Sequence, residues 1–374
     1  MKHAGMNMGQ VKKQNRSSIL NCICEMGPVS RKDIAQITGL TPAAVTLICN
    51  EFMEQQLLFE IGQSTESQGV GRKKVLVDIN YDYAYIFAVN IEQEHTTVAL
   101  TNMKGEVKEL QTLATKMGKA PEVLLKQVAD VCRGMLGKYK VAGVSVALTG
   151  IVDKEKGTSV HAYGIWQDEV PVCEILEKEL GYPVVIENNV NAFAIAELMY
   201  GFGKKYDNLL VIKWGPGVGS TIIIDNKVYE GRHAKAAELG HFIVERDGAV
   251  CDCGRRGCLE TKVSYKALAA QKPFAQNEFG EAYRLAKTKG DAGVFDEAID
   301  LFARTIVNSI TILAPNRVVL CGRLFQDEEI RARLIEQCKQ YDPGCDEKRI
   351  IYSVLAEKED YIGPVAAFVQ EEIF

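Results

Sequence analysis

The sequence has no apolar run long enough to cross a lipid bilayer, so we expect no transmembrane helix and no membrane partner. The N-terminal stretch MKHAGMNMGQVKKQNRSS is polar and lacks the apolar core of a signal peptide. The eleven cysteines do not form the even, spaced set of a secreted disulfide framework. They are scattered apart from one cluster, which indicates a reducing cytoplasm and a single metal site. We therefore expect a cytoplasmic protein.

Length and composition predict two or three soluble globular domains. The chain has 374 residues, of which 47% are hydrophobic and 25% charged. The total net charge of −5 is unevenly distributed: residues 1–80 carry nine Lys and Arg against seven Asp and Glu, a net charge of +2, which leaves −7 for the remainder. Only a head formed by residues 1–80 could therefore meet a polyanion, and residues 81–374 are expected to form a separate body.

One short segment, 237–261, contains a cluster of metal-ligand side chains. It holds one imidazole and three thiols, at His241, Cys251, Cys253 and Cys258. This Cys3His set suits tetrahedral zinc, and with no open ligand position the metal would be structural. Buried cysteines can also pack simply as small apolar residues. Charged residues are interleaved with these cysteines, however, and that favours the zinc site.

The first 80 residues show the pattern of a winged helix-turn-helix. Residues 14–26 carry a helical apolar stripe that ends at Gly27-Pro28. Ser30 is a good N-cap for a short helix over 31–37, and Thr41 for a third helix that starts at Pro42. Strands over 57–61 and 73–77 flank a polar tip, and this hairpin would be the wing.

The winged helix predicts an operator DNA partner. An arginine on the Gly-rich tip could enter a narrow minor groove, while the third helix, which has no Lys or Arg, would read bases with small and amide groups. A single module binds weakly, so specific binding implies a dimer on a two-fold operator. A head that binds protein, or has lost DNA binding, is the alternative. The candidate DNA-contacting residues are Arg31, Thr41, Pro42, Ala43, Thr46, Asn50, Arg72 and Lys73.

The body reads as a duplicated α/β unit with a cleft between halves at about 81–200 and 201–374. The first half has strands over 85–91, 96–101 and 141–149, a helix over 121–139, and a strand that leads into a helix over 183–200. The second half opens with strands over 208–213 and 220–225. Between them lies a turn with glycines at Gly215, Gly217 and Gly219, which could approach a phosphate. Glycines in a hairpin can also serve the backbone alone, so spacing leaves the role of this turn open.

Four motifs follow the winged head in a fixed order. They are Glu187-Asn188-Asn189, the turn Gly215–Gly219, Glu238-Leu-Gly-His241, and Cys251-x-Cys253-Gly-x-x-Gly-Cys258-Leu-Glu260. With them the whole chain resembles the ROK family of repressors, uncharacterised frames and sugar kinases, in particular its xylose and N-acetylglucosamine repressor branch. The resemblance implies an actin-like ATPase (sugar kinase) fold, a structural zinc beside a sugar cleft, and a homodimer or tetramer. Carried over by position, it implies that sugar hydroxyls contact Asn188, Glu238, His241 and Glu260, and Asn189 could also hydrogen-bond the sugar.

Two departures from the family kinases favour a regulator over an enzyme. The stretch Asn90–Thr96 stands where those kinases have a D-I-G-G-T-type phosphate turn, and its Glu92 and Glu94 would repel phosphate. Asn189 replaces the aspartate base, and an amide cannot take the proton of a sugar hydroxyl.

We therefore expect a sugar-responsive repressor of carbohydrate-utilisation genes with no catalytic residue, released by a sugar or phosphosugar. An ATP-dependent sugar kinase with an appended head and a sugar sensor without DNA binding are the alternatives, and the Gly215–Gly219 turn leaves residual nucleotide binding possible. We expect residues outside the motifs to set the choice of sugar, such as Tyr163, Trp166 and Lys235.

Overall fold

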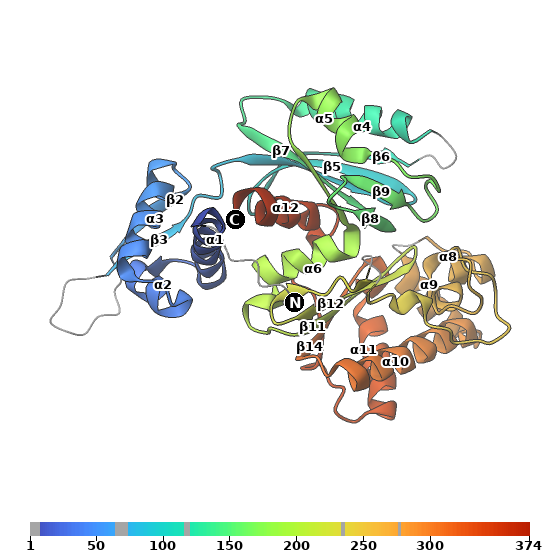
Figure 1. Ribbon diagram of the computed structural model, residues 1–374. Coiled ribbons are helices and arrows are strands. Elements are labelled where there is room, and N and C mark those ends of the chain that lie inside the picture. Colours follow the sequence, from blue (N-terminus) through green and yellow to red (C-terminus); the bar gives the residue numbers. More distant parts are fainter. Residues whose placement is uncertain (1–7, 64–73, 116–119, 233–235, 276–277) are drawn as a thin grey trace.

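The computed structural model describes residues 8–63, 74–115, 120–232, 236–275 and 278–374. They form a small N-terminal head and a body of two α/β lobes, which lie one above the other in Figure 1. None of the helices in these ranges is both long and apolar enough to cross a membrane.

The head is a winged helix with a three-stranded sheet in the order β1-β3-β2. Both predicted helix caps are present: the Ser30 hydroxyl accepts a hydrogen bond from Asp33 N at 3.2 Å, and Thr41 accepts one from Ala44 N at 3.2 Å. Gly39, with φ 70°, ends the second helix in the left-handed conformation. The predicted wing tip falls on residues 64–73, outside the described residues. The head elements are α1 (Met8–Met26), β1 (Val29–Ser30), α2 (Arg31–Thr38), α3 (Pro42–Glu54), β2 (Leu58–Gln63) and β3 (Val75–Ile79).

The first lobe is a five-stranded sheet in the order β10-β7-β4-β5-β6, with α4 and α5 on one face. β4 pairs antiparallel with β5 and parallel with β7, so the meander and the α/β crossovers share one sheet. The small β8-β9 pair lies beside the sheet. The elements are β4 (Tyr85–Ile91), β5 (His95–Asn102), β6 (Val107–Ala114), α4 (Pro121–Met135), β7 (Val141–Leu148), β8 (Ile151–Asp153), β9 (Thr158–His161), α5 (Val172–Leu180), β10 (Val184–Asn188) and α6 (Asn189–Tyr200).

The second lobe repeats this plan, with a sheet in the order β13-β12-β11-β14-β15. Its central strand β11 again pairs antiparallel with the next strand and parallel with a later one. The duplicated α/β fold class is therefore confirmed. The elements are β11 (Leu209–Trp214), β12 (Val218–Ile224), β13 (Lys227–Val228), α7 (Glu260–Val263), α8 (Tyr265–Gln271), α9 (Phe279–Thr288), α10 (Gly293–Leu313), β14 (Arg317–Cys321), α11 (Glu328–Tyr341), β15 (Ile350–Tyr352) and α12 (Ile362–Phe368).

The C-terminal helix α12 returns to the first lobe, where it packs on α6 and on β4 and β7. Its Phe368 ring lies against Gly143 of β7, where any Cβ would collide with the ring. The chain thus returns to the first lobe after the last strand of the second-lobe sheet. Hydrophobic pattern alone could not place this helix, because a buried apolar segment packs equally well on either sheet.

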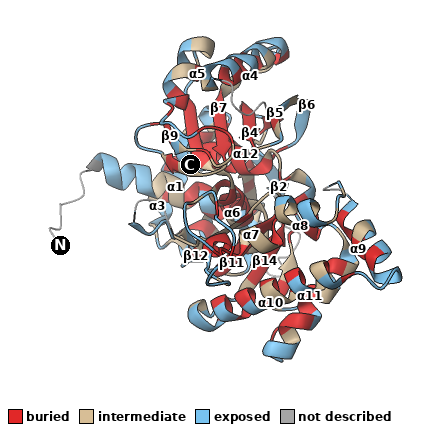
Figure 2. Cartoon of the chain, turned by 90° about the vertical axis from the view of Figure 1, so that its right-hand side faces the viewer, coloured by how far each residue is buried: buried red, intermediate tan, exposed pale blue. Residues whose placement is uncertain are grey.

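Head and body share one hydrophobic core, since buried side chains of the head continue without a break into α6, α12 and both sheets. Figure 2 shows buried residues at the centre of both lobes and on α6. Two further clusters lie under α4 and α5 in the first lobe and around α10 and α11 in the second. A shared core of this kind opposes free rotation of the head on the body.

Candidate functional site

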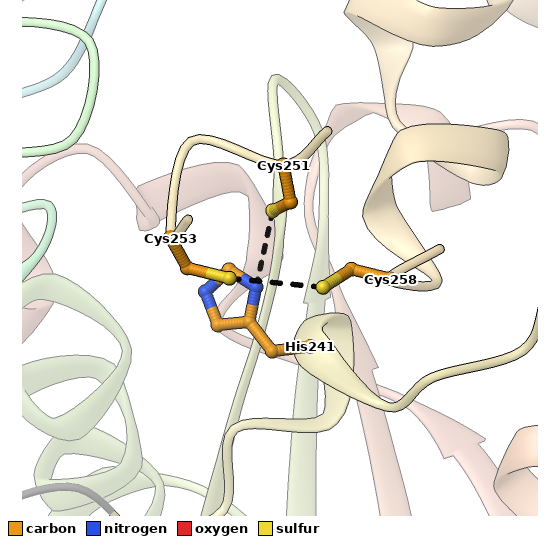
Figure 3. A group of neighbouring side chains, drawn as sticks. All are labelled: His241, Cys251, Cys253 and Cys258. Atoms are coloured by element: carbon orange, nitrogen blue, oxygen red, sulfur yellow. Dashed lines mark hydrogen bonds between the residues drawn. The ribbon is translucent and has the colours of Figure 1, made fainter. Parts of the chain in front are cut away.

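The predicted metal ligands converge beside the cleft, with their ligand atoms all within 4.8 Å of one another (Figure 3). His241 Nδ1 lies 3.5 Å from Cys251 Sγ, and the sulfurs of Cys253 and Cys258 are 3.7 Å apart. A tetrahedral zinc with ordinary bond lengths would separate a nitrogen and a sulfur ligand by about 3.5 Å and two sulfurs by about 3.8 Å. These two separations match those expected for ligands of one tetrahedral metal ion.

Backbone geometry explains how four ligands from separate turns meet at one point. His241 ends a single 3-10 turn, Leu239–His241, and the cysteines follow on a knuckle closed by a hydrogen bond from Cys251 N to Arg255 O at 2.8 Å. Gly257 has φ 69°, and a Cβ there would collide with the carbonyl oxygen of Glu245. Only glycine therefore allows this crossing of the two segments.

The knuckle also sets the charge state of its thiols. Burial alone would raise the pKa of the Cys253 thiol, but hydrogen bonds, first among them that from Arg255 Nε at 3.4 Å, hold this pKa below its usual value. Burial raises the pKa of Cys251, and the nearby Glu260 adds to the increase. A bound metal cation would deprotonate both thiols, because its charge outweighs these local effects.

All five predicted sugar-contacting residues line one cleft of about 350 Å³ between the lobes. Glu238 and Glu260 flank His241 on the side of the second lobe. His241 Nε2 lies 3.7 Å from Glu238 Oε2, whereas its Nδ1 faces the cysteines and lies 3.8 Å from Glu260 Oε1. One ring nitrogen thus belongs to the metal cluster, while the other lies beside Glu238.

Asn188 and Asn189 stand on the first-lobe side, where β10 passes directly into α6. The Asn188 side chain caps α6 by accepting hydrogen bonds from Val190 N and Asn191 N, and its amide donates to Gly150 O at 2.8 Å. The Asn189 amide donates to Glu92 Oε1 and to Thr149 Oγ1. Much of the hydrogen-bonding capacity of both side chains thus serves the protein itself.

The Gly-rich turn between β11 and β12 opens onto the same cleft, and Gly215, Gly217 and Gly219 all line it. A Cβ at Gly219 would collide with Val190 of α6, so this glycine permits close contact between the lobes. Gly217 is the glycine that lies against the cleft carboxylate Glu260.

Residues 86–369 match the family model described as "ROK family". The chain belongs to the ROK family. It is 28% identical over 263 residues to the "Xylose repressor" of Bacillus subtilis (strain 168), which covers 69% of this chain and 67% of that protein. It is 25% identical over 352 residues to the "DNA-binding transcriptional dual regulator NagC" of Escherichia coli (strain K12), which covers 89% of this chain and 86% of that protein.

Solved structures confirm the fold of this ROK protein. A crystal structure described as "ROK family transcriptional regulator, homolog of E.coli MLC protein" superposes with a TM-score of 0.79 at 23% identity and covers 96% of this chain and 97% of that chain. A ROK family glucokinase from Streptomyces griseus in complex with glucose and AMPPNP gives a TM-score of 0.63 at 24% identity, over 76% of this chain and 99% of that one.

The ROK body contains a buried ion pair that sequence reasoning missed. Glu92 Oε1, at the end of β4, lies 2.5 Å from Lys213 Nζ on β11, and both side chains are about 90% buried. Burial alone would lower the pKa of Lys213, but Glu92 and Glu359 raise it, so the ammonium stays charged. The expectation that Glu92 would repel phosphate did not take this cation into account. The two residues lie 121 positions apart, and no local pattern links them.

Polar contacts between the lobes continue from this ion pair away from the cleft. Arg323 Nη2 of the second lobe lies 3.2 Å from His95 Nε2 of β5, and Asp360 Oδ1 lies 3.6 Å from that histidine nitrogen. Burial raises the pKa of Glu359 to about 7, and its Oε2 has no hydrogen-bond partner among the described residues. Together these groups form the interlobe latch: Glu92, His95, Lys213, Arg323, Glu359 and Asp360.

Of the residues expected to tune specificity, one reaches the cleft. Tyr163 lines it, with its ring 5.8 Å from that of His241. Trp166 does not, because it is buried in the first-lobe core with its indole N–H donating to Ser159 Oγ. Lys235 lies outside the described residues. An apolar side chain that reads as pocket lining in the sequence can equally complete a core.

The predicted DNA-contacting residues of the third helix, Pro42, Ala43, Thr46 and Asn50, are exposed on α3, and Thr41 is exposed at its cap. Arg31 is half-buried, and its guanidinium lies 3.1 Å from Glu60 Oε1 and 3.4 Å from Asn50 Oδ1. It is thus positioned to orient Asn50. Arg72 and Lys73 fall outside the described residues.

Proposed function

We propose that this protein is a sugar-responsive, DNA-binding transcriptional regulator that acts as a repressor. The observation that carries the proposal is the position of α6, which starts at the cleft with Asn189 and ends at the winged head with Met199 and Tyr200. A ligand in the cleft and an operator on the head would thus both act on the position of α6. The relative named "Xylose repressor" supports this direction of regulation.

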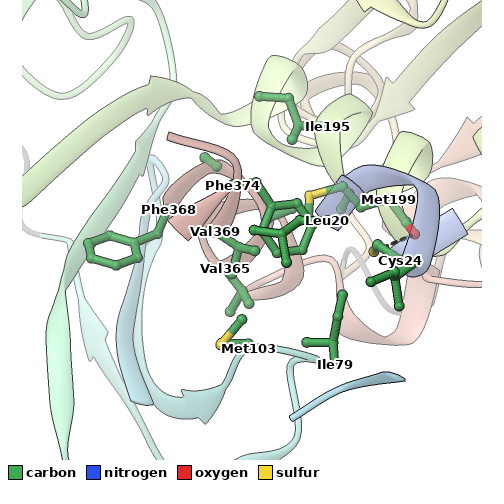
Figure 4. Close-up of a cluster of buried hydrophobic side chains, with 14 of the residues drawn as sticks. Leu20, Cys24, Ile79, Met103, Ile195, Met199, Val365, Phe368, Val369 and Phe374 are labelled. Atoms are coloured by element: carbon green, nitrogen blue, oxygen red, sulfur yellow. Dashed lines mark hydrogen bonds between the residues drawn. The ribbon is translucent and has the colours of Figure 1, made fainter. Parts of the chain in front are cut away.

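The coupling would pass through a packed apolar joint rather than a flexible linker. Cys24 Sγ of α1 donates to Met199 O at 3.6 Å, and Leu20 packs between α6 and α12 (Figure 4). The Tyr200 hydroxyl donates to Met103 O at 2.7 Å, so the same end of α6 also holds the first-lobe sheet. A shift of α6 would therefore carry the head with it, because close-packed interiors move as units.

We propose that the head contacts operator DNA through the exposed face of α3, with Thr41, Pro42, Ala43, Thr46 and Asn50, together with Arg31, Arg72 and Lys73. Small and amide side chains suit thymine methyl groups and adenine edges in the major groove. One such head offers few contacts, so a homodimer or tetramer would present two heads to a two-fold operator. The division into a head over 1–80 and a body over 81–374 is part of this proposal.

The sugar would lie between Glu238, His241 and Glu260 on one side and the two asparagines on the other. Carboxylates accept hydrogen bonds from adjacent hydroxyls, and the asparagine amide groups can supply further hydrogen bonds. Because these groups would be left unpaired by an analogue without the hydroxyls, such a site discriminates strongly.

We propose that the metal is zinc and that its role is structural. Three thiolates and one imidazole complete a tetrahedron, so no position is left for a reacting water. The cluster would hold the His241 ring in one orientation toward the cleft.

We further propose that the cleft binds and does not phosphorylate. Asn189 stands at the position of the family base, and loss of a positioned base costs on the order of 10²- to 10⁴-fold in rate. The latch pair Glu92–Lys213 lies next to it and joins the two lobes. The alternative, a sugar kinase, is favoured only by the retained Gly215–Gly219 turn.

Footprinting of the DNA upstream of its own gene, with and without sugars, tests the proposal. We expect protection of a two-fold symmetric site that one sugar abolishes. Absence of protection at any salt concentration would favour a sensor without DNA binding. Turnover of tens per second in a coupled ATPase assay with sugars would establish the kinase instead.

A further inference from the structure

We infer that Arg31 fixes the side-chain amide of Asn50 on α3, so that this amide offers N–H donors to the major groove and selects guanine over adenine. The inference rests on the proposed function, because it names the base that the same DNA-binding face would read. It gives Arg31 a positioning role and Asn50 a base preference.

Arg31 begins α2, yet its guanidinium lies between α3 and the wing strand β2. Its Nη2 is 3.1 Å from Glu60 Oε1 on β2, and 3.4 Å from Asn50 Oδ1 and 3.5 Å from Met53 Sδ on α3. Asn50 and Met53 are three positions apart, so they are neighbours on one side of the helix. Three elements of the head thus meet at one arginine.

The first turn of α2 holds both strands of the wing. Arg31 pairs with Glu60 on β2, and only 26% of the Arg31 side chain is exposed. Two residues further along α2, Asp33 Oδ1 lies 2.8 Å from the Nζ of Lys74, which directly precedes β3. The guanidinium is therefore fixed by its surroundings, and the amide of Asn50 has to adapt to it.

The charge of Arg31 determines which end of this amide faces it. A side-chain amide has an acceptor oxygen at one end and two N–H donors at the other, whereas a guanidinium has donors only. The Asn50 oxygen faces the guanidinium, and turning the amide by 180° would bring its N–H groups against those of a cation. Because Asn50 is exposed on α3, the donors are what it offers to DNA.

Guanine and adenine differ at the edge that such an amide contacts. An asparagine that is free to turn pairs with adenine through both ends, since it accepts from N6 and donates to N7. With Oδ1 of Asn50 turned toward Arg31, the adenine N6 donor has no acceptor opposite it. Guanine presents two acceptors, N7 and O6, which suit the N–H donors.

Selection of bound sequences from a pool of randomised DNA duplexes by the full-length protein tests the inference. The wild type should favour guanine over adenine by roughly tenfold at one pair of symmetry-related positions. Asn50→Asp keeps an oxygen for Arg31 but replaces the donors with a second acceptor. It should therefore favour cytosine, whose N4 group donates, at the same positions.

Arg31→Met removes the cation and leaves an unbranched side chain beside Met53, so the amide of Asn50 can turn. The preference should then shift toward adenine by roughly tenfold, whereas a purely structural role would lower the affinity for all sequences alike. Gln36→Glu, at an exposed position of α2, is the matched control for Asn50→Asp. It makes the same amide-to-carboxylate change and should leave the selected bases unchanged.

A wild-type preference for adenine at the positions that Asn50→Asp alters, or an unchanged preference in Arg31→Met, would overturn the inference and leave the proposed regulator intact. The same holds if no selected base depends on Asn50. If Arg31→Met does not fold, the comparison of the wild type with Asn50→Asp decides whether the amide presents donors. If the wild-type protein enriches no sequence at all, the proposed function fails and the inference fails with it.

Discussion

The two walls of the cleft use polar residues in opposite ways. On the second-lobe wall, His241 lies between Glu238 and Glu260, and both carboxylates line the cleft. On the opposite side, Glu92 is enclosed by Lys213, Asn189 and Asn90 and is almost fully buried. The first wall is suited to a ligand, whereas the second ties the lobes together. A polar residue in a cleft can thus serve either task, and its partners decide which.

The largest effect is expected from removing one of the proposed metal ligands on the second-lobe wall of the cleft. Cys253→Ser removes one of four ligands, so we expect the protein to lose stoichiometric zinc and DNA binding together, as support for the cleft wall collapses. Metal content and operator affinity would be measured on the same preparation. Cys173→Ser, in the first-lobe core, is the control and should keep both. A metal-free Cys253→Ser protein with wild-type operator affinity would disprove the link.

Breaking the Glu92–Lys213 pair on the opposite wall should have a smaller effect, and we expect it to lower the free energy of unfolding. Lys213→Met leaves Glu92 buried without its cation, so we expect a loss of about 3–5 kcal/mol in the free energy of unfolding. Urea denaturation measures it. The double variant Lys213→Met with Glu92→Gln should recover most of the loss, because no uncompensated charge remains. A single variant as stable as the wild type would show that the pair is solvated rather than buried.

Glu359, a member of the interlobe latch, should make the free energy of unfolding depend on pH. Burial raises the pKa of its carboxyl from 4.5 to about 7, so the folded protein holds a proton that the unfolded chain has lost. The resulting stability is present below pH 4.5 and is lost as pH rises through 7, by roughly 3 kcal/mol in total. The difference in unfolding free energy between wild type and Glu359→Gln should therefore change over this window and level off above it. A difference that is flat with pH would contradict the raised pKa.

The smallest effect is expected where α6 meets the head. Met199→Ala should leave sugar binding intact but weaken the release of DNA by sugar, by about 0.5–2 kcal/mol of coupling free energy. Operator affinity with and without saturating sugar measures this coupling. Val128→Ala, buried under the first-lobe sheet away from the head, controls for general loss of packing. Unchanged coupling in Met199→Ala would mean that the head is not controlled through this joint.

Local chemistry made much of the molecule predictable. Ser30 and Thr41 mark the starts of helices through their side chains, and the structure has these starts where the sequence predicted them. The strand over 85–91 and the helix that ends near Tyr200 are likewise placed as expected, because each has a clear apolar period and a clear terminator. The metal cluster could be predicted for the same reason, since its four ligands lie within eighteen residues.

Long-range packing could not be predicted in this way. The Glu92–Lys213 pair, the return of α12 to the first lobe and the burial of Trp166 all depend on which surfaces meet after folding. The interpretation that Glu92 would repel phosphate left out Lys213, because this partner lies on another sheet. The sequence gives the formal charge of a side chain, but the electrostatic effect of that charge depends on neighbours that only the tertiary structure supplies.

By itself the sequence determined the family, the duplicated α/β body, the winged head and the cluster of His241, Cys251, Cys253 and Cys258, because each follows from residue type and spacing over short distances. The tertiary structure decided which polar groups remain available. It placed Glu260 on the glycine turn, Asn188 on the end of α6 and Lys213 on Glu92. Availability depends on contacts across the cleft, and those contacts exist only once both lobes and the head have packed into one core.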